Sequence, residues 1–81
     1  AVGYTLRGYV AQEKGQYDEA VGWHREAAAR APKDVEVQVA LALALSQAGK
    51  REECMKVLRE ALALDPKSDL AQRAITLVGE N

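Results

Sequence analysis

GQYDEAVGWHREAAARAPK, residues 15–33, returns in altered form as GKREECMKVLREALALDPK, residues 49–67. Both stretches begin with Gly, end in Pro-Lys, and carry the triplet Arg-Glu-Ala at the same place. Gly and Pro are the residues that most often mark the ends of helices and turns. Their recurrence at one constant offset therefore indicates an internal repeat of about 34 residues.

Each unit of this repeat is predicted to be a pair of helices. Gly15 and Gly49 end the first helix of their units, because glycine readily takes the left-handed conformation that closes a helix. Pro32 and Pro66 end the second helix, since proline disfavours helical geometry in the residue before it. Small and apolar residues between these points recur every three or four positions, as on one buried helix face. The predicted helices span residues 3–14, 17–30, 35–48, 51–64 and 69–78.

Residues 35–45 pose an ambiguity, because their large apolar side chains alternate as in a strand. The run is longer than most strands, and its other positions are mostly Ala, so we predict a central helix buried between neighbours. The fold is then all-α, with antiparallel helical hairpins stacked as an α-solenoid. We assign residues 1–34 and 35–68 to two repeats, and residues 69–81 to a capping helix and tail whose outer positions are small or polar.

Composition excludes several classes of function. Eleven Lys and Arg balance twelve Asp and Glu for a net charge of −1, whereas nucleic-acid binding needs an excess of cations. No apolar run reaches the roughly 18–20 residues that span a bilayer, so we expect no membrane partner. A lone Cys54 and the absence of a leader segment favour a reducing, cytoplasmic location. Because the first residue is Ala1 and not Met, we expect an excised or processed piece.

The two units resemble the tetratricopeptide repeat, a 34-residue helical hairpin with small residues and a closing Pro at set positions. The first unit matches the family pattern at Tyr4, Gly8, Ala20, Ala27 and Pro32, and departs from it at Arg7, Ala11 and His24. The second matches at Leu41, Ala42, Cys54, Leu58, Ala61 and Pro66, with Gln38 in place of the aromatic residue. The resemblance implies a right-handed superhelix whose first helices line a concave groove. It also implies a scaffold or adaptor that binds a protein or peptide partner and has no catalytic activity.

Groove residues are carried over from the family by their positions. They are Val2, Thr5, Tyr9 and Gln12 in the first helix, Glu36, Val39, Leu43 and Ser46 in the third, and Leu70, Arg73 and Leu77 in the fifth. All lie off the predicted packing stripes, so we expect them to face solvent. Exposed apolar side chains of this kind often mark a binding site. The alternative is that they only enlarge a small core.

A second hypothesis concerns the outer side of the first helix. Leu6 and Val10 fall where a preceding repeat would pack. They form either an upstream-repeat face or an oligomer face, and in the latter case the protein is a self-assembling structural element. Stacked repeats bury a continuous core, so an uncovered end favours association.

No residue set predicts an active site, a metal or a cofactor. His24 lies on a buried stripe, and we expect it to pack. Cys54 occupies a small-residue position and is expected to be a buried small hydrophobe. One Cys and one His do not supply the four ligands of a typical zinc site. Trp23 either covers the convex edge of the core or serves as an exposed anchor for a second partner.

Overall fold

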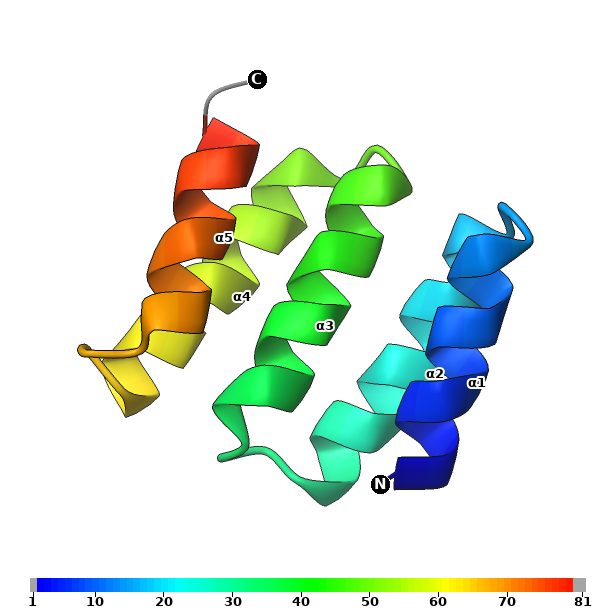
Figure 1. Cartoon of the computed structure of the whole chain (residues 1–81), viewed down its shortest axis with the longest axis horizontal. Helices are drawn as coiled ribbons and strands as arrows, with labels where there is room; N and C mark the ends of the chain where they lie inside the picture. Colours follow the sequence, from blue (N-terminus) through cyan, green and yellow to red (C-terminus); the bar gives the residue numbers. More distant parts are fainter. Residues whose placement is uncertain (1, 80–81) are drawn as a thin grey trace.

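The computed structural model describes residues 2–79, apart from the side chain of Val2, and that range folds into five α-helices (Figure 1). They are α1 (Val2–Glu13), α2 (Tyr17–Arg30), α3 (Val35–Gln47), α4 (Arg51–Leu64) and α5 (Asp69–Gly79). Each predicted helix ends within one residue of the observed boundary, and the predicted all-α repeat fold is confirmed. Residue 1 of the first predicted repeat and residues 80–81 of the predicted tail lie outside the described residues.

Two antiparallel hairpins, α1–α2 and α3–α4, stack side by side, and α5 packs against α3 and α4. Figure 1 shows α1, α3 and α5 on the near side of the molecule, with α2 and α4 behind them. The central helix α3 contacts all four others. The alternating run in residues 35–45 is therefore a helix surrounded by neighbours, as the near-continuous apolar sequence predicted.

The turns inside the two hairpins are built alike. Gly15 has a φ of +75° and Gly49 a φ of +81°, a conformation that strains residues with a side chain. The backbone N–H of Gln16 donates to the carbonyl of Ala11 at 2.9 Å, and that of Lys50 to Leu45 at 2.8 Å. These are hydrogen bonds of the Schellman type, which satisfy the last carbonyls of α1 and α3.

The joints that follow the two hairpins, one leading to α3 and the other to α5, are also alike. The Gln38 side-chain amide donates to the carbonyl of Pro32 at 3.1 Å, and Gln72, 34 positions later, donates to Pro66 at 2.9 Å. The Asp34 carboxylate caps α3 by accepting from the backbone N–H groups of Glu36 and Val37. The equivalent Ser68 hydroxyl accepts from Ala71 N–H at 3.2 Å. Gln38, which departs from the family's aromatic residue, is thus a structural part of the joint.

Small residues set the spacing of the core. Ala side chains at the helix contacts are fully buried and let the backbones approach closely, as at Ala20, Ala27, Ala42, Ala44, Ala61 and Ala71. The largest fully buried side chains are Leu45, Leu58, His24, Val39 and Cys54. No helix within residues 2–79 is long and apolar enough to cross a membrane.

Candidate functional site: a groove across α1, α3 and α5

A hollow of about 280 Å³ lies where α1, α3 and α5 meet. Its lining residues are Gln12 from α1, Leu43, Ser46 and Gln47 from α3, and Leu77 and Val78 from α5. Four of them were predicted as groove residues: Gln12, Leu43, Ser46 and Leu77. The first helix of each unit and the capping helix therefore all contribute side chains to this hollow.

The prediction that Val39 faces solvent is wrong. Its side chain is only 2% exposed and belongs to the core. The physical reason is the central place of α3, which packs against four helices and has only a narrow strip left for solvent. Leu43, one turn further on, is half-buried and packs partly against the same core.

The remaining predicted groove residues lie along the two outer helices. Tyr9 is 49% exposed, and its ring meets the His24 ring edge-on with 5.2 Å between centroids. Thr5 is half-buried, and Leu70 is exposed on α5. Glu36 is exposed at the start of α3, whereas the side chain of Val2 lies outside the described residues.

Arg73 is the cation of the predicted groove, and it already has a partner. Its guanidinium contacts the Asp69 carboxylate at 2.8 Å, one turn earlier on α5. Both side chains are largely exposed, and an exposed pair at this spacing contributes only about 0.3–0.5 kcal/mol. Arg73 and Leu77 also line a second hollow of about 490 Å³ along α5. The pair can therefore open at low cost for an acidic group entering there.

A chain of polar side chains runs beneath the groove. The Gln12 amide donates to the Gln47 side-chain carbonyl, and the Gln12 carbonyl accepts from His24 Nε2 at 2.9 Å. With Nε2 as the donor of a neutral ring, Nδ1 is a bare acceptor, and it has no partner among the described residues. Burial lowers the pKa of His24 by penalising the imidazolium. This chain ties α2, α1 and α3 together and fixes the Gln12 amide at the groove floor.

Two lining residues, Gln47 and Val78, were missed. Gln47 lies one turn beyond Leu43 on the same side of α3, so helical spacing alone was enough to find it. Val78 is buried in the core. It lines the hollow because the edge of the core is also the floor of the groove.

Cys54 and His24, the most reactive side chain types in the chain, are both buried. Cys54 is fully buried, and desolvation raises the pKa of its thiol despite a hydrogen bond with the Ser46 backbone and the nearby Arg51 charge. Its predicted role as a buried small hydrophobe is confirmed, as is the burial of His24. Across residues 2–79, no three His, Cys, Asp or Glu side chains gather so that they could hold a metal ion.

Trp23 belongs to an aromatic cluster on the outside of the first hairpin. It is half-buried against the core, and its ring stacks on Tyr4 with 6.0 Å between centroids. The Arg7 guanidinium lies 5.0 Å from the Trp23 ring centroid, and Arg30 covers Tyr4 at 4.5 Å. The indole thus covers the edge of the core, which was one of its two predicted roles.

Comparison with known proteins agrees with this architecture. A sequence model of the tetratricopeptide repeat matches residues 11–78. Human tetratricopeptide repeat protein 7B is 38% identical over 60 residues, which cover 74% of this chain and 7% of that protein. The uncharacterized protein ycf37 of Cyanophora paradoxa is 26% identical over 75 residues, 93% of this chain and 44% of that protein. The chain thus spans less than half the length of both relatives.

Proposed function

The chain belongs to the tetratricopeptide repeat family, whose non-catalytic repeats generally mediate protein–protein interactions, and we propose that it holds a segment of a partner protein in the groove of α1, α3 and α5. The bound segment is a peptide or helix with at least one apolar side chain. The protein acts in this way as a scaffold or adaptor.

The observation that supports this proposal is the apolar rim of the groove. Leu77 is 62% exposed beside the half-buried Leu43, and together they flank the hollow across α3 and α5. Exposed aliphatic side chains around a concave site favour binding, because covering them removes apolar surface from water. One leucine side chain transferred into such a site contributes about 1.5–3 kcal/mol.

The polar floor supports the orientation of the bound segment. Gln12, Gln47 and Ser46 place amide and hydroxyl groups between the two leucines. A few fixed polar groups in an apolar site typically orient a ligand and provide specificity. Arg73, released from Asp69, pairs with one acidic group of the partner.

The test is a peptide selection followed by two matched variants. Twelve-residue peptides selected from a random displayed library on the intact chain are titrated against Leu77→Glu and Leu64→Glu. Both leucines are exposed near the C-terminal end of a helix, but Leu64 belongs to α4, away from the groove. We expect Leu77→Glu to weaken binding at least tenfold and Leu64→Glu to leave it unchanged. Equal affinities for both variants would place the site elsewhere.

A second variant probes the α3 side of the same groove. Leu43→Glu is expected to abolish binding while circular dichroism shows the helical content intact. Because Leu43 is half-buried, a loss of helicity in this variant leaves Leu77→Glu as the deciding measurement.

Self-assembly is the second candidate function. It is favoured by the exposure of Leu6, 62%, and Val10, 45%, on the outer side of α1. Sedimentation equilibrium over a wide concentration range distinguishes the two functions. Association that Val10→Lys suppresses supports self-assembly, whereas a monomer throughout the range refutes it.

A further inference from the structure

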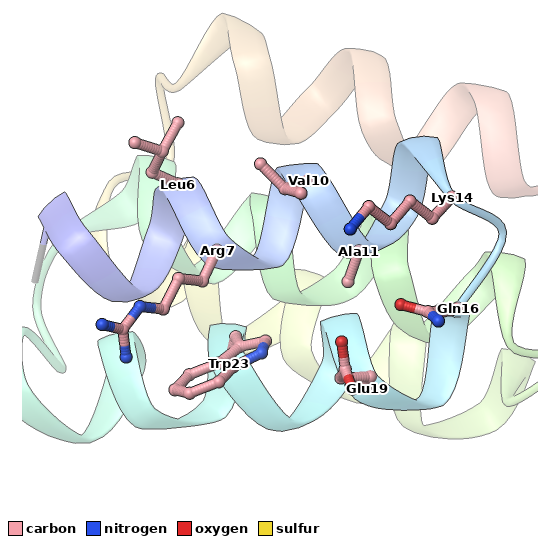
Figure 2. A pocket seen from close by; sticks show the side chains of 8 residues that line it. All are labelled: Leu6, Arg7, Val10, Ala11, Lys14, Gln16, Glu19 and Trp23. Atoms are coloured by element: carbon pink, nitrogen blue, oxygen red, sulfur yellow. The ribbon is translucent and has the colours of Figure 1, made fainter.

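A further hollow lies on the outer face of the first hairpin, between α1 and α2, and is separate from the groove. It measures about 270 Å³ and has the buried Ala11 among its lining residues. Figure 2 shows Leu6 and Val10 pointing away from α2, whereas Arg7 and Ala11 point toward it. Trp23 lies on the α2 side of the hollow. We call this surface the α1–α2 outer face.

The internal repeat shows what covers such a face. A shift of 34 residues carries the α1 residues of the outer face onto Ala40, Leu41, Ala44 and Leu45 of α3. All four are buried, and α3 packs against the α2 helix of the preceding hairpin. Within this molecule, then, a helix occupies the equivalent face.

The side chains of the outer face differ in size, however, from those of the equivalent face of α3, which we call the covered face. Leu6 and Val10 stand where the covered face has Ala40 and Ala44, so two positions are larger. In contrast, Ala11 replaces the large Leu45, which leaves the hollow above it. A helix that fits the outer face must therefore have small residues opposite Leu6 and Val10 and one bulky apolar residue over Ala11.

The two faces also differ in charge. Arg7 and Lys14 replace the buried Leu41 and the half-buried Ala48 of the covered face. Glu19 is the one acidic side chain among the described residues that line the hollow. The Arg7 guanidinium rests on Trp23, so its position is already fixed. The outer face therefore has two cations against Glu19, a net excess of one positive charge, whereas the equivalent positions of the covered face have Lys50 balanced by Glu53.

We infer that the α1–α2 outer face binds an amphipathic helix of a separate partner protein, one that brings carboxylates to Arg7 and Lys14 and a bulky apolar side chain to the hollow above Ala11. Arg7 and Lys14, which directly follows the last residue of α1, are seven positions apart, about 10 Å along the helix axis. Two carboxylates seven positions apart on the partner helix match this spacing, with the apolar residue between them.

A designed peptide tests the inference without a known partner. The probe is an 18-residue Ala/Gln-based helix with blocked ends, one central Leu, and Glu residues three positions before and four positions after it. Trp23 is the only tryptophan of the chain and lines the hollow, so its fluorescence emission reports occupancy directly. We expect saturable binding with a shift of the Trp23 emission to shorter wavelength, lost when the Leu of the probe is replaced by Ser.

Charge-reversal variants distinguish binding at this site from nonspecific electrostatic attraction between the protein and the probe. Lys14→Glu is expected to weaken binding at least tenfold, and a probe in which Lys replaces only the Glu that faces position 14 is expected to recover it. Lys33→Glu, with the same change of charge in an exposed turn, serves as the matched control and should leave binding unchanged. Leu77→Glu in the groove should also have no effect, so the outcome is independent of the proposed groove function.

Three results would overturn the inference. The first is no change of Trp23 emission at millimolar probe. The second is equal affinity of Lys14→Glu and Lys33→Glu for the probe. The third is a dimer without probe that Lys14→Glu or Val10→Lys dissociates, because the occupant is then a second copy of this chain.

Discussion

Replacing Gly8 by Ala forces a methyl group against the buried imidazole of His24. A Cβ at this position would lie 2.5 Å from both Cε1 and Nε2 and 2.8 Å from Nδ1 of the ring. Real Cβ atoms do not approach their neighbours so closely, and the ring is fully buried with little room to retreat. Either His24 moves, or α1 and α2 separate.

Two opposing effects set the size of the change. Ala in a helix interior is normally more stable than Gly by about 0.5–1 kcal/mol. Overpacking of a filled core costs about 1–3 kcal/mol, and displacing the ring also breaks the Nε2–Gln12 hydrogen bond, worth about 1 kcal/mol. We therefore expect Gly8→Ala to lower the free energy of unfolding by about 1–3 kcal/mol. The midpoint of thermal unfolding should fall by about 4–8 °C for each kcal/mol lost.

The assay is urea unfolding followed by circular dichroism, with two comparison variants. Gly22→Ala is the matched control, since Gly22 lies inside α2 with nothing within 4 Å of an added Cβ. It should stabilise the protein by about 0.5–1 kcal/mol. The double variant Gly8→Ala/His24→Leu installs the pair that the second repeat has as Ala42 and Leu58. It should recover most of the loss. A stable Gly8→Ala, or a double variant no better than the single one, would refute the contact argument.

Three further predictions concern buried and capping groups. Burial lowers the pKa of His24, so the unfolded chain binds more protons below its ordinary pKa of about 6.5. The contribution of the neutral His24 ring to the free energy of unfolding should be complete above that pH. It should fall by up to about 1.4 kcal/mol per pH unit as the pH drops toward the pKa of His24 in the folded protein. Urea titrations at several pH values should show this slope and its absence in His24→Leu. Cys54 should react slowly with iodoacetamide in the native protein and rapidly in urea, because its thiol is buried and its pKa raised; fast native labelling would contradict the packing. Asp34→Ala should cost about 1 kcal/mol by removing the α3 cap, while Asp34→Asn, which keeps an acceptor oxygen, should cost less in the same unfolding assay.

Local signals were sufficient to predict the helices. Gly15 and Gly49 end α1 and α3 because their left-handed conformation is a property of glycine itself. Pro32 and Pro66 act in the same local way on the residues before them. The repeat period then placed the hairpins next to each other, which required no knowledge of individual contacts.

The groove was predicted less completely, because it depends on how many neighbours each helix has. Val39 was assigned to the solvent-facing groove from its position in the family pattern, whereas the four helices around α3 leave it buried. The link from His24 through Gln12 to Gln47 was not predicted at all. Its three members lie on three helices, and no sequence spacing states that their side chains meet.

The joints at Pro32 and Pro66 have a consequence for the curvature of the molecule. Gln38 and Gln72 make the same hydrogen bond at each joint, so α3 and α5 are attached in the same way to the hairpin before them, and in a longer array each such joint would make an equal step. Equal steps accumulate into a superhelix of regular pitch. Tandem copies of residues 35–68 would accordingly lengthen the concave surface while its pitch stays constant. An extended protein of this kind would present equivalent binding positions to a partner at even intervals, one for every 34 residues of its own chain.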